Sequence, residues 1–599
     1  MPFADANRPS LSLTQLRSRV LQCCPVTSCD IVYINQDAAL YFGEDLFRAI
    51  AQQYTAGLGD WLFRHLAFPF ATANASIYFS RHFPFQDQKS QDIKQMLLER
   101  RDGLDVFLQK MVEKHDLASA DLVGFSSMFS QNVASFALCS LLKKRNPSCI
   151  TAIGGANCES PMGQELARHI HQVDFVFSGP SLISFPELVT KIMCEDKQGC
   201  HEIGGVFSRQ NVDSAQMVAL AGKELPIDEC IPLDYDSFLD CFDHNFPRQR
   251  QTKTLTFETS RGCWWGQRSH CTFCGLNSQG MQYRSMSANV AVEKLQEVLA
   301  YSDRCKHFAC VDNIMPQNFT TEVLPKLDVP PGVEIFYEVK ADLDDTQLAL
   351  LAEKKITRVQ PGIEALYTKI LKLMKKGTTA YGNIRFLMSC ARHGIFPDWN
   401  LLVGFPGETA EVYQFYIANL PLMVHLPPPG GCYPVRFDRY SPYFMSPEKF
   451  GLNLQPYDCY KDIYPLEKGA ISNLAYYFQD NNYKAEYSKN MLKNIDTLRS
   501  IVVHWNLLWE GAQPKLEWTP SQTVLDTRLG SRREHWLTEV ERTALRRLTE
   551  FKSASSVAAN CPALEGENVE AVLISLKEKG LVFEEGSNRW GSLVLEPMT

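Results

Sequence analysis

The sequence lacks the features that would place a protein in a membrane, outside the cell or on nucleic acid. No apolar run reaches the roughly 18 residues that a membrane-spanning helix needs. The first residues have neither the basic nor the apolar segment of a secretory signal, so we expect a cytoplasmic protein with no membrane partner. Lys and Arg number 60 against 68 Asp and Glu, a net charge of −8, and this balance disfavours a nucleic-acid partner.

A disulfide framework is also disfavoured. The 19 cysteines are an odd number in a chain that we do not expect to be exported. Most of them should be buried as small apolar side chains, and the exceptions should stand out by their spacing. With 599 residues, 45% of them hydrophobic, the chain can bury large cores in about three to five domains.

Residues 115–245 alternate between strand and helix patterns. Strands are predicted within 118–125, 149–153 and 173–177, with helices at 131–144 and 161–169. This alternation predicts a parallel sheet, and ligands bind at the carboxyl edge of such sheets. No G-x-G-x-x-G motif is present, so a dinucleotide is disfavoured; the edge glycines also suit plain tight turns. Farther upstream, residues 29–34 predict a strand and residues 43–66 a helix.

A second alternating region spans residues 253–425. Its predicted strands at 254–258, 306–311, 333–339, 359–364 and 398–403, with helices between them, indicate a full or partial β/α barrel. Residues 425–530 are rich in Pro and Tyr and are expected to be irregular. Residues 531–599 predict three helices and a hairpin around residues 585–588, which is a winged-helix pattern.

The sharpest motif is a loop with the spacing C-x7-C-x2-C, formed by Cys263, Cys271 and Cys274 directly after a predicted strand. Three thiolates do not complete a tetrahedral structural zinc site. They suit a [4Fe–4S] cluster in which one iron stays open to a ligand. Two alternatives remain at this level: a zinc site completed by His270, and three unrelated cysteines.

This loop, at the head of a β/α pattern, resembles that of the radical S-adenosylmethionine superfamily. The usual spacing there is C-x3-C-x2-C with an aromatic residue before the last cysteine, where Phe273 stands here. The longer spacing is similar to that of the cobalamin-dependent radical S-adenosylmethionine C-methyltransferases that mature ribosomally synthesised peptide natural products. The resemblance runs from residue 1 to about residue 450, through segments 7–10, 123–126 with Gln131, 154–157, 258–263, 336–340, 360–364 and 404–408.

The resemblance implies that the three cysteines hold the cluster and that its open iron binds S-adenosylmethionine. It also implies that Lys340 contacts the carboxylate of S-adenosylmethionine and Glu338 its amine, on one face of a strand. Glu364 would bind the ribose, and Gly407, next to Glu408, would shape the adenine pocket. A salt bridge inside the barrel explains Glu338 and Lys340 equally well. A plain βα turn explains Gly407 equally well.

The 115–245 sheet then becomes a cobalamin-binding candidate. The sequence has no Asp-x-His-x-x-Gly motif, so cobalamin would bind without a histidine ligand to cobalt. Trp264 and Trp265 would wall the cofactors, and Arg436 and Tyr440 would contact substrate; ordinary packing explains these four residues as well. The candidates for holding cobalamin are Ser126, Ser127, Gln131, Gly154, Gly155 and Gly179.

The sequence therefore predicts an α/β protein of four parts. A Rossmann-like cobalamin domain would span 1–245 and a radical S-adenosylmethionine barrel 250–455. A Tyr-rich connecting or substrate region would span 456–530, and a small winged-helix-like α+β domain 531–599. The C-terminal domain would bind DNA, dock a leader peptide by strand addition to its hairpin, or cap the barrel.

The predicted reaction is methyl transfer from S-adenosylmethionine, through methylcobalamin, to an unactivated sp3 carbon of a precursor peptide. An electron donor such as a flavodoxin or ferredoxin would reduce the cluster. A second hypothesis keeps the cofactors but rearranges, cyclises or oxidises the substrate. Two others are a DNA-binding cofactor sensor and a methylthiotransferase acting on tRNA; the latter ordinarily needs three further cysteines at a second cluster site.

Overall fold

The computed structural model describes residues 1–24, 28–214, 218–247, 252–276, 280–586 and 589–596. Its contacts divide the chain into two compact units. Unit 1 comprises Met1–Phe257, Ala300–His307 and Leu454–Gln479, and unit 2 comprises Glu258–Leu299, Phe308–Asn453 and Asp480–Thr599. None of the described helices is long and apolar enough to cross a membrane.

Unit 1 begins with helices rather than with the predicted strand at residues 29–34. Residues 29–33 have no regular structure, and helix α2 starts at Ile34. The β-branched run is short, and buried contacts along α2, including Asp37 with His115 at 2.9 Å, favour the helix instead. The N-terminal helices are α1 (Leu11–Cys23), α2 (Ile34–Phe42), α3 (Glu44–Gln52), α4 (Leu58–Ala67), α5 (Ala75–His82), α6 (Gln88–Asp102) and α7 (Leu104–Lys114).

The predicted helix over residues 43–66 is two helices, α3 and α4. Gly57 separates them with a φ of +63°, a left-handed conformation that side chains disfavour. A Cβ at this position would lie 2.4 Å from Ile463 Cδ1, so the close packing also requires glycine.

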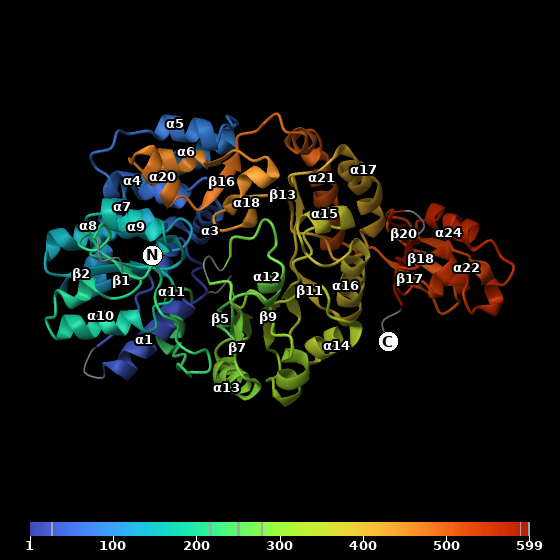
Figure 1. The fold of residues 1–599 in the computed structure, drawn as a ribbon, viewed down its shortest axis with the longest axis horizontal. Coiled ribbons are helices and arrows are strands. Elements are labelled where there is room, and N and C mark those ends of the chain that lie inside the picture. The colour runs from blue at the N-terminus through green and yellow to red at the C-terminus, as the bar shows by residue number, and fades with distance from the viewer. Residues whose placement is uncertain (25–27, 215–217, 248–251, 277–279, 587–588, 597–599) are drawn as a thin grey trace. The chain divides into compact units, whose positions relative to one another are not determined.

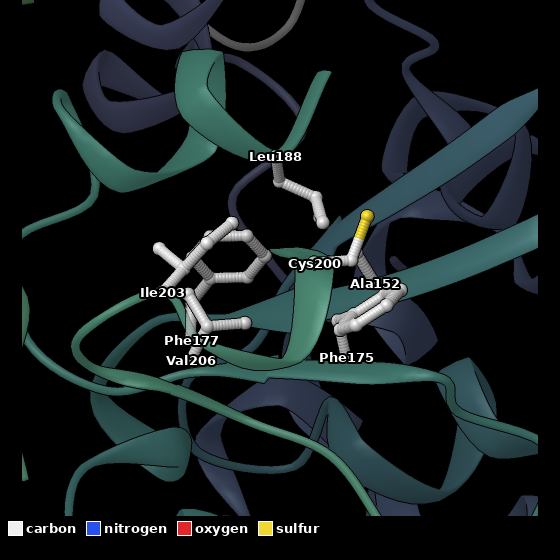
Figure 2. Packing of buried hydrophobic residues seen from close by; sticks show 7 residues of the cluster. All are labelled: Ala152, Phe175, Phe177, Leu188, Cys200, Ile203 and Val206. Carbon is white, nitrogen blue, oxygen red and sulfur yellow. The ribbon is translucent and has the colours of Figure 1, made fainter. Parts of the chain in front are cut away.

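The parallel sheet predicted in residues 115–245 is confirmed. Strands β1 (Leu122–Ser126), β2 (Ile150–Gly154) and β3 (Phe175–Phe177) pair in parallel, and β4 (Val206–Phe207) joins β3 in antiparallel. Helices α8 (Asn132–Arg145), α9 (Met162–His169) and α10 (Ser184–Met193) alternate with the strands along the chain (Figure 1). Figure 2 shows one core of this sheet, formed by Ala152, Phe175, Phe177, Leu188, Cys200, Ile203 and Val206. Helix α11 (Asp236–Asn245) and strand β5 (Thr254–Phe257) follow.

The second alternating region has parallel strands separated by helices, so the α/β class is confirmed. Strands β11 (Phe396–Pro397), β10 (Arg358–Gln360), β9 (Glu334–Glu338) and β8 (His307–Cys310) neighbour one another in that order, and β12 (Leu401–Val403) pairs in parallel with β13 (Cys432–Pro434). The helices are α13 (Ala288–Leu299), α14 (Asp345–Glu353), α15 (Thr368–Leu373), α16 (Ala380–His393) and α17 (Ala410–Asn419).

Residues 425–530, expected to be irregular, contain a 25-residue helix, α21 (Glu486–Glu510). Its buried residues Ile495, Leu498, Val502 and Trp505 follow helical spacing, a pattern that the Pro and Tyr content of the region obscured. The shorter elements here are β14 (Phe437–Asp438), α18 (Pro442–Met445), β15 (Leu454–Pro456), α19 (Asp458–Ile463), α20 (Lys468–Leu474) and β16 (Tyr477–Asp480).

The chain ends in a C-terminal module, residues 516–596, drawn in red in Figure 1. The predicted helices are present as α22 (Glu539–Arg546), α23 (Ala554–Ala558) and α24 (Val569–Glu578), and the hairpin as β20 (Val582–Glu584) and β21 (Trp590–Ser592). Ser587 and Asn588 of its predicted turn lie outside the described residues. The sequence analysis missed an antiparallel sheet of β17 (Leu516–Trp518), β18 (Val524–Asp526) and β19 (Arg533–His535).

Candidate active site

The cysteine loop of unit 2 is shaped by a strand pair and one glycine. Strand β6 (Ser260–Arg261) pairs with β7 (Arg284–Ser285) just before Cys263, which caps the short helix α12 (Trp264–Arg268). Gly262 has a φ of +78°, and a Cβ there would lie 2.4 Å from the carbonyl oxygen of Gln282. The turn that presents Cys263 therefore requires glycine.

A second segment, residues 373–377, holds this loop from the side. The backbone N–H of Thr272 donates to Met374 O at 3.1 Å, and its hydroxyl donates to Leu373 O at 3.0 Å. The indole of Trp265 donates to Lys375 O at 3.1 Å, and its ring packs against Gly377, where a Cβ would be 2.1 Å away. The backbone of residues 373–377 therefore fixes the position of the cysteine loop.

The aromatic residues of the loop also pack within unit 2. The indole N–H of Trp264 donates to Met315 O at 3.1 Å. Phe273 meets Phe405 edge to face, with ring centroids 5.8 Å apart. The two tryptophans proposed as a cofactor wall thus use their N–H groups to anchor the loop.

The electrostatics around the three thiols centre on Lys376. Burial raises the pKa of Cys274 to about 12. Burial also raises the pKa of Cys271, and the Lys376 ammonium offsets part of that rise. Burial by itself would lower the pKa of Lys376. The charges of Glu364 and the three cysteines outweigh burial, so the pKa of Lys376 is raised. Among the described side chains no three His, Cys, Asp or Glu residues stand in a metal-binding arrangement.

Three acidic groups share this neighbourhood. Burial, followed by the charges of Asp312 and Glu364, raises the pKa of Glu338 to about 7. Glu364 stands at a positive φ of +57°, with its carboxylate 3.6 Å from the Lys376 ammonium. The structure therefore brings Glu338 and Glu364 into one electrostatic neighbourhood with the cysteine loop.

Lys340 does not lie on a strand with Glu338 as the sequence analysis expected. Strand β9 ends at Glu338. The ammonium of Lys340 pairs with Asp342 at 2.9 Å and lies 4.6 Å from the ring centre of Trp265. Because β9 ends two residues earlier, the alternation that would align the two side chains does not reach Lys340.

The turn after β12 holds a buried carboxylate. Gly404 and Gly407 have φ values of +80° and +94°. One oxygen of Glu408 accepts hydrogen bonds from Gly404 N at 2.8 Å and from the Tyr413 hydroxyl at 2.6 Å. Its other oxygen, Oε1, is buried and finds no hydrogen-bond partner among the described residues. An unpaired acceptor of this kind fits a ligand that carries an N–H or O–H donor.

We expect Glu408→Gln to change how stability depends on pH. Burial raises the pKa of Glu408 to about 7, against the hydrogen bonds that lower it. The folded state therefore holds this proton more tightly, and the stability it contributes at low pH is lost as the pH rises toward 7. The variant has no titrating group at this position. Its free energy of unfolding, relative to that of the unsubstituted chain, should therefore rise by about 3 kcal/mol between about pH 5 and pH 8. Urea unfolding measures this, and Glu353→Gln, at an exposed site at the end of α14, should leave the profile unchanged. Equal profiles for both variants would contradict the assignment.

Asp312 is a site residue that the sequence analysis missed. Its buried carboxylate accepts from Thr259 N at 2.7 Å, the Thr259 hydroxyl at 2.6 Å and the Ser260 hydroxyl at 2.8 Å. It therefore anchors the strand that leads into Cys263. An acidic residue two positions after the end of β8 was the available signal, because site residues gather at the carboxyl ends of barrel strands.

In unit 1, the carboxyl edge of the sheet brings Ser126, Ser127, Gly154 and Gly155 together. Ser126 pairs with Gly154, and Ser127 N donates to Gly154 O at 2.7 Å. Asn157 donates to the Ser127 hydroxyl at 3.0 Å. A Cβ on Gly155, whose φ is +104°, would lie 2.5 Å from Ser127 O, so two backbone segments touch here.

The other two candidates at this edge have different surroundings. The Gln131 side chain accepts from Met128 N at 2.9 Å and so closes the loop after β1. Gly179, with a φ of +74°, follows β3, where an added Cβ would meet Ala221 Cβ at 3.1 Å.

Two large apolar side chains at the same edge were not anticipated. Met128 and Phe129 are 47% and 51% exposed, and Phe129 has a strained φ of +50°. Its carbonyl accepts from Asn157 at 2.9 Å, and its ring lies 5.1 Å from that of Tyr54. The ligand edge of the sheet thus combines a polar pair, Ser127 and Asn157, with an exposed apolar surface.

The structure places Arg436 beside an acidic residue. Its guanidinium donates to Asp438 at 3.2 Å, while the other carboxylate oxygen of Asp438 is buried without a partner among the described residues. Tyr440 has a φ of +69°. These contacts fit an internal polar network in unit 2 and leave one acceptor for a further donor.

Comparison with known proteins identifies the class of the central segment. Residues 257–416, which contain the cysteine loop, Glu338, Lys340, Glu364 and Gly407, match the sequence model of the Radical SAM superfamily. This segment is therefore similar to that superfamily, whose cofactors are a [4Fe–4S] cluster and S-adenosylmethionine. No curated protein matches the sequence.

Among solved structures, the chain is similar to OxsB with aqua-cobalamin bound, a cobalamin-dependent S-adenosylmethionine radical enzyme, at 16% identity and a TM-score of 0.44. That match covers 79% of this chain and 65% of OxsB, so the chain spans just under two thirds of that protein. It is also similar to the radical S-adenosylmethionine methyltransferase TsrM of Kitasatospora setae, at 17% identity and a TM-score of 0.44, over 60% of this chain and 71% of TsrM.

Proposed function

We propose that this chain is a cobalamin-dependent radical S-adenosylmethionine methyltransferase that methylates an unactivated sp3 carbon of a peptide. The observation that carries the proposal is the three-cysteine loop within the radical S-adenosylmethionine domain, gathered with Glu338 and Glu364 around Lys376. When bound, the cluster and S-adenosylmethionine supply a carbon-centred radical, and cobalamin supplies the methyl carrier.

The residues present fit a cluster and S-adenosylmethionine. Cys263, Cys271 and Cys274 are soft sulfur ligands from one loop, the donor type that iron–sulfur clusters use. Glu338 and Glu364 offer carboxylates to the amine and the ribose hydroxyls of S-adenosylmethionine. The free oxygen of Glu408 offers a buried acceptor beside Gly407, where the sequence predicts the adenine pocket.

The carboxyl edge of the unit 1 sheet fits cobalamin. The cofactor has a polar nucleotide tail and a broad, largely apolar ring. This edge offers the half-buried Asn157 side chain and the exposed backbone of Gly155 for the first, and Met128 and Phe129 for the second. The role of the residues is to hold the cofactor and keep water from reactive species. The absence of Asp-x-His-x-x-Gly in the sequence supports binding without a histidine ligand.

The partners belong to the same proposal. A precursor peptide is the substrate, and a flavodoxin or ferredoxin is the electron donor. Docking of a leader peptide on the C-terminal hairpin is weakened by its contacts, because β21 already pairs on its other side with Lys552. The Tyr381 hydroxyl lies within hydrogen-bonding distance of Leu548 O and Ser592 O, at 2.9 and 3.1 Å, and this supports the barrel-cap role for the module.

The test of methyl transfer needs no knowledge of the peptide at first. Anaerobically reconstituted protein is given cob(I)alamin and S-adenosylmethionine carrying a deuterated methyl group, and labelled methylcobalamin is the expected product. Peptides from cells that make the active chain are then compared by mass with those from cells that make Cys263→Ala. A peptide heavier by one methylene group only with the active chain supports methylation. A mass change of any other kind supports the alternative of rearrangement, cyclisation or oxidation.

We expect Gly155→Ala to weaken cobalamin binding at least about tenfold, because the added Cβ meets Ser127 O and the positive φ adds strain. Gly43→Ala is the matched control, since Gly43 also belongs to unit 1 and has a φ of +83° but nothing within 4 Å of an added Cβ. Equilibrium titration with hydroxocobalamin measures both. Equal affinities for the two variants would contradict the placement of cobalamin at this edge.

A further inference from the structure

Lys376 stands at the centre of the candidate active site, and the sequence analysis assigned it no role. Its side chain is 16% exposed, and its ammonium lies 3.6 Å from the Glu364 carboxylate. The same ammonium interacts electrostatically with Cys263, Cys271 and Cys274. It also acts on the buried carboxyl group of Glu338. One cation, 3.6 Å from Glu364, therefore follows directly on the segment hydrogen-bonded to the cysteine loop and acts electrostatically on its three thiols.

The backbone, rather than the flexible stem of the lysine, sets its position. The carbonyl groups of Leu373, Met374 and Lys375 accept hydrogen bonds from the cysteine loop, one of them from the Trp265 indole. Gly377 follows at a φ of +67° with the Trp265 ring against it. The segment that carries Lys376 is thus fastened to the segment that carries the cysteines on both sides of the lysine.

The opposite side of the site leaves room for the ammonium. A Cβ on Gly362 would lie 2.7 Å from the Lys376 Nζ, so a larger residue there would displace the cation. Gly362 and Glu364 belong to one turn after β10, and this turn supplies both the space and the counter-charge. The cation therefore occupies a fitted position beside the cysteine loop.

A fixed cation at this position has a direct electrostatic consequence for a cluster held by the three thiolates. One-electron reduction adds one negative charge to a group that is already anionic through its ligands. A nearby positive charge stabilises the more negative state, and a partly buried pair is screened little by salt. Cluster potentials respond to net charge and surroundings in this way.

We propose that Lys376 raises the reduction potential of the cluster bound by Cys263, Cys271 and Cys274. The inference rests on the cluster assigned in the proposed function. The electron comes from a low-potential flavin or iron–sulfur donor and stays on the cluster; no covalent bond forms or breaks, and Lys376 keeps its proton. Lys376 acts through the cluster and so contributes electrostatically to its reduction.

The test compares three variants of the full chain after anaerobic reconstitution with iron and sulfide. Lys376→Met removes the charge, Lys376→Arg keeps it, and Lys372→Met removes an exposed charge from the neighbouring helix α15 as the matched control. Potentiometric titration followed by electron paramagnetic resonance gives the midpoint of each. In Lys376→Met we expect reduction of the cluster to be at least about tenfold less favourable, which corresponds to a midpoint potential about 59 mV more negative. The midpoints of the other two variants should stay near that of the unsubstituted chain.

The outcomes distinguish an effect of the Lys376 charge from misfolding and from loss of the cluster. A full cluster with an unchanged midpoint in Lys376→Met would overturn the inference, as would equal loss of the cluster in Lys376→Met and Lys376→Arg. Loss of the cluster in Lys376→Met alone would also overturn the inference, because the charge would then serve cluster binding rather than the reduction potential. If the unsubstituted chain binds no cluster, the proposed function fails, and this inference falls with it.

Discussion

Replacing Cys263, Cys271 and Cys274 together by alanine is expected to abolish iron–sulfur binding and reductive cleavage of S-adenosylmethionine. The three residues supply every thiolate of the loop, so the substituted chain keeps no sulfur ligand at this place. Cobalamin binding should persist, because its proposed cradle uses Gly155, Asn157 and their neighbours in unit 1. Anaerobic absorbance spectra and iron analysis, with and without cobalamin, measure the two cofactors separately.

A second triple variant controls for the loss of thiols in general. Cys23, Cys194 and Cys230 are exposed and lie outside the loop, so their replacement by alanine should leave the cluster intact. Iron retained at full occupancy in the loop variant would refute the cluster assignment. Joint loss of iron and corrin would show that the two cofactors do not bind independently.

The fold could be predicted where local pattern decides it. The carboxyl ends of β1, β2 and β3 fall within one residue of their predicted ends, because apolar runs end at small residues on the sheet edge. The prediction failed at residues 29–34, where β-branched residues end before a helix begins. It also missed the helix α21, whose 3.6-residue periodicity lies within an unusual composition.

The candidate site shows the same division between local and distant information. The cysteine spacing and Glu364 are visible in short motifs, and the structure places them together. Lys376 and Asp312 lie 102 and 38 residues from Cys274, and only the fold brings them to the loop. The roles of Glu338 and Lys340 toward S-adenosylmethionine stay predictions; β9 ends at Glu338, and Lys340 lies over the Trp265 ring of the cysteine loop.

The C-terminal module is held within unit 2 by aromatic and polar contacts. Tyr381 stacks on Phe551 with ring centroids 5.2 Å apart, and Thr368 N donates to Glu585 at 2.5 Å. The buried His425 ring contacts Leu593 O at 2.9 Å. These contacts support the third of the roles predicted for the module, a cap on the predicted barrel, which stays a prediction.

A buried ion pair at the base of the module gives the largest expected effect on stability. The Arg528 side chain, 5% exposed, donates to both oxygens of Asp526 at 2.9 and 2.7 Å and to Leu422 O at 2.6 Å. Burial alone would raise the pKa of Asp526, but hydrogen bonds from Arg528 and His535 outweigh it and hold the pKa well below its usual range. This pair therefore links the module to the helical segment at Leu422.

Arg528→Met is expected to lower the free energy of unfolding of the module by about 3–5 kcal/mol at neutral pH, because it leaves the Asp526 carboxylate buried without its partner. A carboxyl with a depressed folded pKa contributes stability above its unfolded pKa of about 4 and loses it as the pH falls. The deficit of the variant should therefore shrink in acid. Asp526→Asn/Arg528→Met should recover most of the loss at neutral pH, since no unpaired charge remains. Urea unfolding followed by tryptophan fluorescence measures all three chains, and a deficit that persists unchanged in acid or in the double variant would show that the charge is not its cause.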